Sequence, residues 1–282
     1  MIRDAIAAAA AELAAAGIDS ARVDAELLAA HAAGVDRAML RFTEPDAAFY
    51  PRYRDVIEQR VRRIPLQHIV GTAPFGPVTV QVGPGVFIPR PETEALLEWA
   101  MGLALPPAPT IVDLCSGSGA LALALAHTRP AARVIAVEKS DDALAYLRRN
   151  CADTGVEVFA ADVTAPGLLA ELDGSVDLVV ANPPYIPDGA RLDPEVADHD
   201  PAQALFGGPD GMAVIVPIVA LAARLLRPHG HLGIEHDDTT SDLTVTAIGA
   251  GGTFGEVVAR RDLAGRPRFV TAAKIAATKT AQ

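Results

Sequence analysis

The sequence predicts an α/β protein in which a mostly parallel sheet carries helices on both faces, preceded by an all-helical N-terminal segment and a β-hairpin. From Thr110 onward, short apolar runs alternate with longer helical patterns, which is typical of a parallel sheet. Before residue 72, the apolar side chains recur at helical spacing instead. Between the two parts, prolines and glycines flank a run of alternating valines, a pattern that indicates two short strands.

Residues 1–72 are expected to form a small helical bundle. Ile6 and Leu13 mark one face of a first helix, which Gly17 ends. Apolar side chains at helical spacing mark the second helix: Val23, Leu27 and Ala30. No group of residues suited to catalysis occurs in this segment, so we expect it to dock or position a substrate.

A third helix is expected over residues 47–64. Its predicted apolar side consists of four residues: Tyr50, Tyr53, Ile57 and Val61. Its predicted outer face carries five arginines: Arg52, Arg54, Arg60, Arg62 and Arg63. Arginines clustered along one helix usually form a solvated face, and we expect the same here.

Residues 73–88 are expected to form a β-hairpin linker, and residues 89–282 the α/β domain. Its seven predicted strands are 110–114, 133–137, 156–160, 176–181, 230–235, 254–259 and 267–272, and its main predicted helices are 119–128, 141–152, 166–172 and 211–226. A short polar loop joins the last two strands, so they should pair antiparallel. Pro217 lies inside a helical pattern and predicts a kink or a late start of that helix.

Composition narrows the class of function. The net charge is −11, which argues against tight non-specific binding to nucleic acid, because such binding needs Lys and Arg to displace counterions. Only two cysteines are present, too few for a disulfide scaffold, and a reducing cytoplasm fits best. Charged residues interrupt the alanine-rich start, so we expect an amphipathic helix there and not a signal peptide, and because no apolar run reaches 18 residues we expect no membrane span.

The strand expected at 176–181 ends in Asn182-Pro183-Pro184-Tyr185. Two prolines cannot continue a sheet ladder, so a polar amide, two rigid residues and an aromatic ring should lie at the tip of a central strand. The carboxyl ends of strands are where open α/β sheets bind ligands. An ordinary turn at the end of a strand is the alternative, since Asn-Pro pairs are common in turns.

A second candidate site follows the strand expected at 110–114. The turn runs Cys115-Ser116-Gly117-Ser118-Gly119, and its glycines allow a close backbone approach to a ligand. Together with Ala122 it also satisfies a dinucleotide fingerprint, so a nicotinamide cofactor remains an alternative on this evidence.

Acidic residues mark the ends of the predicted strands. Glu138 follows the second strand, where a carboxylate can accept hydrogen bonds from ribose hydroxyls. Asp162 follows the third and suits the amine of an adenine, with Val163 against the ring. Asp113 precedes the glycines, as in S-adenosylmethionine enzymes, where the methionine ammonium of the ligand lies near such an acid. Three acids and Asn182 at four successive strand ends favour S-adenosylmethionine over a nicotinamide.

Four stretches together resemble the HemK/PrmC family of glutamine N5-methyltransferases: Pro65–Gly71, Phe87–Glu94, Asp113–Gly119 and Asn182–Tyr185. The resemblance implies a Rossmann-like, seven-stranded class I methyltransferase sheet. Three departures occur. Cys115-Ser116 replaces the usual Gly-Thr, Glu138 replaces Asp, and 235–240 replaces a usual Glu-x-Gly-x-x-Gln.

The resemblance implies transfer of a methyl group from S-adenosyl-L-methionine to the glutamine of the Gly-Gly-Gln motif in peptide chain release factors, with S-adenosyl-L-homocysteine as the product. Asn182, Pro183 and Tyr185 would be catalytic, and Asn182–Tyr185 would bind the substrate amide. Cofactor binding would fall to Asp113, the 115–119 turn, Glu138, Asp162, Val163 and Asn182. Two alternatives remain: an adenine N6-methyltransferase acting on nucleic acid, because Asn-Pro-Pro-Tyr is shared with that class, and a non-catalytic adaptor. His229, His231 and His236 lie near Asp237 and Asp238, but the resemblance implies no metal.

Overall fold

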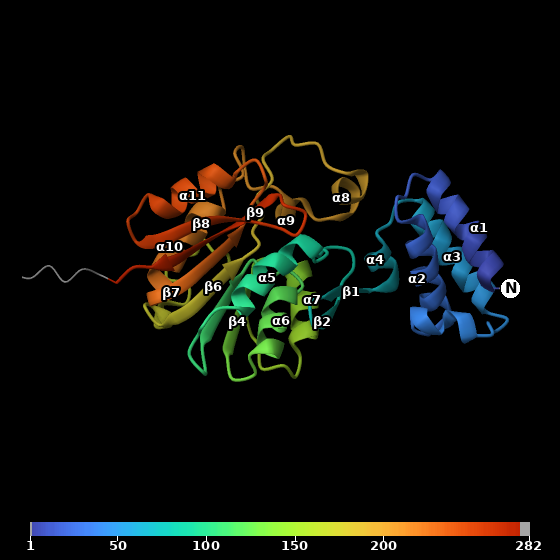
Figure 1. Cartoon of the computed structure of the whole chain (residues 1–282), viewed down its shortest axis with the longest axis horizontal. Helices are drawn as coiled ribbons and strands as arrows, with labels where there is room; N and C mark the ends of the chain where they lie inside the picture. The colour runs from blue at the N-terminus through green and yellow to red at the C-terminus, as the bar shows by residue number, and fades with distance from the viewer. Residues whose placement is uncertain (1, 277–282) are drawn as a thin grey trace, which may run out of the picture. The chain divides into compact units, whose positions relative to one another are not determined.

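The computed structural model describes residues 2–276 and divides into two compact units (Figure 1). The outer ends of the first and last predicted domains, Met1 and residues 277–282, lie outside the described part. The helical unit runs to Thr72 and also includes Leu192–His199, a segment more than a hundred residues further along the chain. The sheet unit contains Ala73–Arg191 and the chain from Asp200 onward. Over residues 2–276, no helix is long and apolar enough to cross a membrane.

The helical unit is built around α1 (Ile2–Ala15), α2 (Ala21–Ala33) and α3 (Phe49–Val61), with shorter pieces η1 (Arg37–Phe42), α4 (Leu66–Val70) and α8 (Pro194–His199). Leu13, Leu28 and Phe49 are completely buried and form the centre of its core. The Tyr53 hydroxyl, also in this core, donates to the Ala25 carbonyl oxygen at 2.9 Å. The many alanines of α1 and α2 let the two helix backbones approach closely.

Three predictions for this unit were wrong. Val23 is 41% exposed and Tyr50 is 45% exposed, because Leu28, Phe49 and neighbouring small residues set the buried faces instead. Arg60 was expected on a solvated face, yet it is only 5% exposed. Its guanidinium Nε donates to the buried Asp24 carboxylate at 2.7 Å, which satisfies both charges inside the unit.

The sheet unit contains the predicted seven-stranded sheet. Its strands are β3 (Thr110–Leu114), β4 (Arg133–Glu138), β5 (Glu157–Ala160), β6 (Val176–Ala181), β7 (Leu226–Glu235), β8 (Phe254–Arg261) and β9 (Pro267–Lys274). The strand order is β5-β4-β3-β6-β7-β9-β8. Strand β9 runs antiparallel to both of its neighbours, β7 and β8, and the other neighbouring pairs are parallel. The predicted fold class is confirmed.

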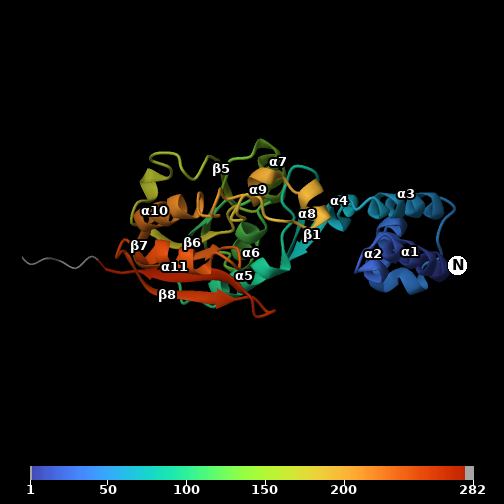
Figure 2. The ribbon, with the colours of Figure 1, turned by 90° about the horizontal axis from the view of Figure 1, so that it is seen from above.

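Helices cover both faces of this sheet. They are α5 (Glu94–Met101), α6 (Ala120–Thr128), α7 (Asp141–Cys151), α9 (Ala202–Leu205), α10 (Ile215–Leu225) and α11 (Ser241–Gly249), with the short η2 (Pro91–Thr93) and η3 (Ala170–Leu172). Neighbouring strand residues point to opposite faces: Ile111 packs in the core under α5–α7, and Val112 packs in the core under α10 and α11. Helix α11 lies against β8 (Figures 1 and 2). A separate hairpin, β1 (Thr72–Phe75) and β2 (Val78–Gln81), precedes these elements.

Two predictions for local structure in this unit were wrong. The helix expected at 166–172 is a turn followed by η3, because Gly167 and Leu169 adopt positive φ of 72° and 53° and interrupt any regular helix. Helix α11 was not predicted, since its β-branched residues disfavour a helix by propensity alone. Pro217 was correctly predicted to mark a late start: α10 begins at Ile215, so Pro217 lies in its first turn.

Candidate active site

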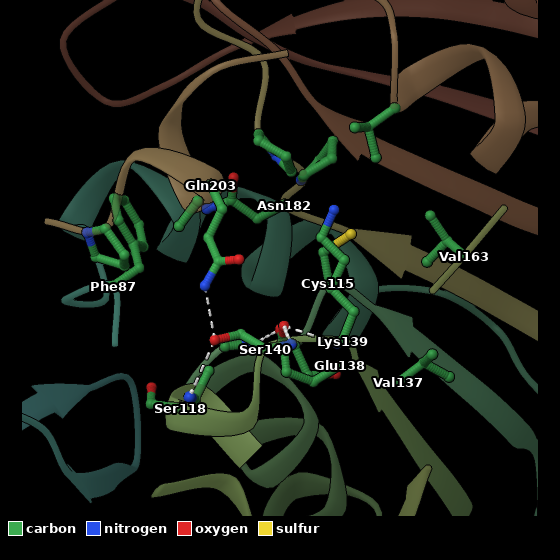
Figure 3. Close-up of a pocket in the computed structure, with 18 of the residues that line it drawn as sticks. Phe87, Cys115, Ser118, Val137, Glu138, Lys139, Ser140, Val163, Asn182 and Gln203 are labelled. Carbon is green, nitrogen blue, oxygen red and sulfur yellow. Dashed lines mark hydrogen bonds between the residues drawn. The ribbon is translucent and has the colours of Figure 1, made fainter. Parts of the chain in front are cut away.

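The sheet topology creates a crevice at the carboxyl ends of β3 and β6. From β3 the chain proceeds outward to β4 and β5, then returns to add β6 on the opposite side of β3. Such a reversal of strand order opens a ligand site, because the connecting segments diverge to the two sides. One pocket of the sheet unit lies there (Figure 3) and is lined by residues from five segments: 113–121, 137–143, 161–164, 182–186 and 201–205, together with Phe87, Pro89 and Thr93.

The turn after β3 needs its unusual backbone. Cys115, Gly117 and Gly119 have φ values of 61°, 56° and 86°, in the left-handed region that favours glycine. Gly119 also has no room for a side chain, because a Cβ there would lie 2.5 Å from the Leu147 side chain. Gly119 is the one predicted site residue that does not line the pocket. Its place at the start of α6 shapes the turn that the other residues line.

Glu138 holds two turns together. One carboxylate oxygen, Oε2, accepts the Gly117 N–H at 2.9 Å, and the other accepts the N–H groups of Lys139 and Ser140, each at 2.8 Å. Figure 3 shows Glu138 in the pocket beside Lys139 and Ser140. A carboxylate has about four acceptor positions, so these three bonds leave one for a ligand hydroxyl.

Asp113 is buried beneath the turn at 1% exposure. Burial raises the pKa of its carboxyl, and hydrogen bonding from Ser116 and the Ala122 N–H offsets only part of that rise, which leaves the pKa at about 7. Within residues 2–276, its Oδ2 atom has no hydrogen-bond partner. A buried, unpartnered carboxylate oxygen at a pocket wall is a site for a cationic group of a ligand.

Asp162 and Val163 form the wall after β5. The Asp162 Oδ1 atom accepts the backbone N–H and the hydroxyl of Thr164 at 2.8 and 2.7 Å, and these bonds lower the pKa of its carboxyl. Its Oδ2 atom lies 3.7 Å from the Lys139 Nζ, at an exposed edge. Val163 is 8% exposed and presents an apolar surface to the pocket.

The Asn182–Tyr185 segment leaves β6 directly into the pocket. The Asn182 Nδ2 group donates to the Thr93 hydroxyl at 3.1 Å, and the Tyr185 hydroxyl donates to the Glu235 Oε1 atom at 2.9 Å. Both proline rings are buried. The segment is therefore fixed at both ends by side-chain hydrogen bonds.

A glycine-rich loop supports the backbone of this segment. The Ile186 N–H donates to the Leu205 carbonyl at 2.8 Å, and the Gly207 N–H donates back to the Ile186 carbonyl at 2.9 Å. A Cβ at Gly207 would lie 2.6 Å from the Pro184 oxygen, and one at Gly211 would lie 2.3 Å from the Tyr185 oxygen. Only glycine permits this approach at either position.

Among the pocket and supporting residues that were not predicted are Phe87, Thr93, Gln203 and Glu235. Arg90 lies over the Phe87 ring at 4.9 Å and pairs with the buried Asp200 carboxylate. The Gln203 amide reaches across the pocket and donates to the Ser140 hydroxyl at 2.8 Å (Figure 3). The clustered glycines at 207–211 signalled a tight loop, but nothing in the sequence indicated what it would contact.

The pocket residues fit S-adenosylmethionine. The unpartnered Asp113 Oδ2 atom suits an ammonium group, Glu138 retains an acceptor for a ribose hydroxyl, and Val163 offers an apolar surface to an adenine. Three side chains of matching chemistry thus line one pocket in the order in which the strands lie. No group of three His, Cys, Asp or Glu residues within the described chain is arranged to hold a metal ion.

Comparison with known proteins gives two family matches and several relatives. A family described as "PrmC N-terminal domain" matches residues 4–71, and one described as "Methyltransferase small domain" matches residues 82–199. A release factor glutamine methyltransferase of Mycolicibacterium smegmatis is 67% identical over 276 residues, covering 98% of each chain. Those of Mycobacterium tuberculosis and Streptomyces coelicolor are 61% and 47% identical, covering 96% and 95% of this chain and 91% and 96% of the relatives.

The sheet and the family match to residues 82–199 define the class: a methyltransferase with an α/β fold. At these identities over nearly the whole length, the chain belongs to the release factor glutamine methyltransferase family. The predicted family is confirmed.

Proposed function

We propose that the protein transfers a methyl group from S-adenosylmethionine to the side-chain amide nitrogen, N5, of the glutamine in the Gly-Gly-Gln motif of peptide chain release factors. The observation that carries this proposal is the placement of Asn182–Tyr185 at the tip of β6, in one pocket with the unpartnered Asp113 carboxylate oxygen. The names of the relatives support release factors as the partner.

Catalysis on an amide depends on positioning. The lone pair of a glutamine nitrogen is delocalised into its carbonyl, so it attacks only when both N–H groups are held and the nitrogen is correctly oriented. Asn182 Oδ1 accepts one N–H, and the Pro183 carbonyl accepts the other. Both acceptors gain strength as positive charge develops on nitrogen, which is how oriented dipoles lower a barrier. The Tyr185 ring stacks on the amide plane, and its face favours the developing cation.

S-Adenosylmethionine would supply an electrophilic methyl group. Asp113 would hold its ammonium, Glu138 its ribose, and Asp162 with Val163 its adenine, while the 115–118 turn would lie along the ligand. Its product, S-adenosylhomocysteine, keeps the groups that these residues contact and serves as a stable binding probe. Both cysteines are free thiols, which suits a reducing cytoplasm, where release factors act.

The test is methylation of a purified release factor with labelled S-adenosylmethionine. Label should enter the intact factor and should be absent from a factor whose Gly-Gly-Gln glutamine is replaced by alanine. Mass spectrometry of the digested factor should place one methyl group on that glutamine. Label in DNA but not in the factor would establish an adenine methyltransferase instead, and label in neither would indicate an adaptor.

We also propose that the helical unit docks the release factor and takes no part in the chemistry. The family match to residues 4–71 is separate from the match to the methyltransferase domain, which supports a separate task. A chain that begins at residue 73 should bind S-adenosylhomocysteine normally and methylate a short Gly-Gly-Gln peptide as the full chain does. Its KM for intact release factor should rise. An unchanged KM for the intact factor would contradict docking by this unit.

A further inference from the structure

The Asn182 side chain has two possible orientations that place opposite chemistry toward a substrate. With Nδ2 bonded to Thr93, the Oδ1 atom is left without a partner in the described chain and can accept an N–H. With the amide reversed, Nδ2 would face the substrate –NH₂, and two donors would oppose each other. Catalysis by Asn182 therefore requires a device that selects one orientation.

Thr93 alone cannot select it. A hydroxyl both donates and accepts, so Thr93 could bond either end of the Asn182 amide. Its hydrogen must point away from Asn182 for the observed bond to form. An acceptor of that hydrogen, placed on the other side of Thr93, would determine the orientation.

Glu235 is a buried carboxylate near Asn182 and Tyr185, and within residues 2–276 one of its oxygens is free to accept that hydrogen. In the parallel pairing of β6 with β7, Ala181 lies beside Ile234, so the next residues, Asn182 and Glu235, leave adjacent strand tips. Glu235 is 1% exposed and accepts the Tyr185 hydroxyl on Oε1, while its Oε2 atom has no partner at hydrogen-bonding geometry within residues 2–276. The Thr93 hydroxyl nevertheless acts on this carboxyl: together with Tyr185 it lowers the pKa of Glu235.

We propose that Thr93 and Glu235 are positioning residues that fix the Asn182 amide with Oδ1 toward the substrate nitrogen, and that Glu235 also holds Tyr185 in place. The inference rests on the proposed methyl transfer to an amide. The charged carboxylate attracts the hydrogens of both hydroxyls, which leaves a lone pair of Thr93 for Asn182 Nδ2. A protonated Glu235 must itself donate a hydrogen bond to one of the two hydroxyl oxygens. Thr93 then no longer fixes the orientation of the Asn182 amide.

The groups around Glu235 determine the pH at which its carboxyl becomes protonated. Burial and the nearby Glu92 carboxylate raise the pKa of this carboxyl, and Thr93, Tyr185 and Arg268 lower it. The balance of these effects leaves the pKa at about 7. The Tyr185 phenol has a pKa raised well above its ordinary value, so it remains the donor throughout the neutral range.

The experiment compares Thr93→Val, Thr93→Ser and Glu235→Gln with the unmodified full chain, measuring kcat at saturating S-adenosylmethionine and the affinity for S-adenosylhomocysteine. Thr93→Val keeps the shape and removes the hydroxyl, so kcat should fall about tenfold or more with unchanged affinity for S-adenosylhomocysteine. Thr93→Ser should recover most of that loss. Thr244→Val is the matched control, because it removes an equally buried hydroxyl bond, at 3.0 Å to the Thr240 carbonyl, outside the pocket.

The pH profile supplies the second readout. In the unmodified chain kcat should decline as pH falls through about 7, as Glu235 becomes protonated, and in Glu235→Gln that decline should disappear at a lower plateau. Normal kcat in Thr93→Val, or the same pH profile in Glu235→Gln, would overturn the inference while the proposed function stands. An unmodified chain that methylates no release factor would overturn both.

Discussion

At the scale of single residues, the protein itself does little to stabilise the ionised form of the Asp113 carboxyl. This carboxyl is buried with a pKa raised to about 7, and one of its oxygens has no hydrogen-bond partner among residues 2–276. A ligand ammonium binds the ionised form, so ligand affinity should rise with pH as Asp113 ionises. We predict that the affinity for S-adenosylhomocysteine increases roughly tenfold between pH 5.5 and 7.5, measured by calorimetry.

The control for that prediction is Asp113→Asn, which keeps the shape and removes the charge. Its affinity should be lower at pH 7.5 and nearly independent of pH over the same range. A steep pH dependence that survives in Asp113→Asn would place the titrating group elsewhere.

Asn182 should matter far more for turnover than for folding. It is partly exposed at the tip of β6, and Asn182→Ala removes only the amide N–H that the Thr93 hydroxyl accepts. Asn182→Ala deletes one oriented acceptor and should lower the single-turnover rate by about 10²–10³. The free energy of unfolding should change by no more than about 1 kcal/mol. Near-normal turnover, or a loss explained by unfolding, would return this segment to an ordinary turn.

At the scale of elements, the glycine-rich loop at 207–211 is the support on which Asn182–Tyr185 rests. Gly211 has φ 78°, and a Cβ there would lie 2.3 Å from the Tyr185 oxygen. Gly211→Ala should therefore lower both stability and turnover, because backbone must move against backbone. Thermal melting and single-turnover methylation measure the two effects.

Gly189 is the control that separates the cost of backbone strain at positive φ from the cost of a steric clash between the new Cβ and its neighbours. Its φ is 79°, nearly the same as at Gly211, but a Cβ at this position would have no neighbour within 4 Å. Gly189→Ala should lose only the left-handed cost of about 1–2 kcal/mol and keep its turnover. Equal effects of the two substitutions would show that close approach to Tyr185 is unimportant.

Strands of the sheet were predictable because their signals are local. The boundaries of β3 and β6 agree with prediction to the residue, since short runs of mostly apolar residues end at Leu114 and at Ala181. Strand β7 begins four residues earlier than predicted, at Leu226, because its pairing with β6 continues past an irregularity near Pro228. The propensities of single residues do not show that β6 continues to pair with β7 beyond such an irregularity.

The candidate site was predictable only for those residues whose role is indicated by their immediate neighbours in the sequence. The strand-end acids and Asn182 were found because polar residues stop apolar runs, and the pocket brings them together. Thr93 and Glu235 lie 89 and 50 residues from the side chains that they bond, and their sequence neighbourhoods give no sign of it. The burial of Arg60 was missed for the same reason: its partners, Asp24 and Glu195, are distant in sequence.

At the scale of the whole molecule, the helical unit holds a segment that is continuous with the active-site loop. Glu195, within Leu192–His199, pairs with Arg60 and Arg63 at 3.0 and 3.1 Å. The chain reaches that segment six residues after Ile186 and leaves it just before the pocket-lining residues that begin at Pro201. The buried Asp24–Arg60 pair keeps the guanidinium in place for Glu195, which explains why this arginine is withdrawn from solvent.

The stability of the sheet unit should reflect the ligand site within it. A buried carboxyl whose pKa is raised from 3.8 to about 7 binds more protons in the folded than in the unfolded state between those values. The free energy of unfolding therefore falls as pH rises from about 4 to 7, and the loss is complete above that range. Asp113 thus destabilises the ligand-free protein at neutral and alkaline pH.

We predict that Asp113→Asn makes the ligand-free chain more stable than the unmodified chain at pH 8, by an amount on the order of 1–4 kcal/mol. The gain should vanish toward pH 4, where Asp113 is protonated. His231 and His236, whose pKa values are lowered by burial, and Glu235, whose pKa is raised to about 7, also contribute to the pH dependence of stability. They are present in both chains, so the difference between the two chains cancels them.

Trp99 is the single tryptophan of the chain and lies on α5, so its fluorescence during denaturant unfolding reports on the sheet unit. Saturating S-adenosylhomocysteine should reverse the order of stability at pH 8, because the ligand ammonium pairs only with the charged carboxylate. A variant that is less stable than the unmodified chain at every pH would show that Asp113 supports the fold itself. A variant that is more stable without ligand and less stable with it would show that the carboxylate is kept for binding at the expense of stability.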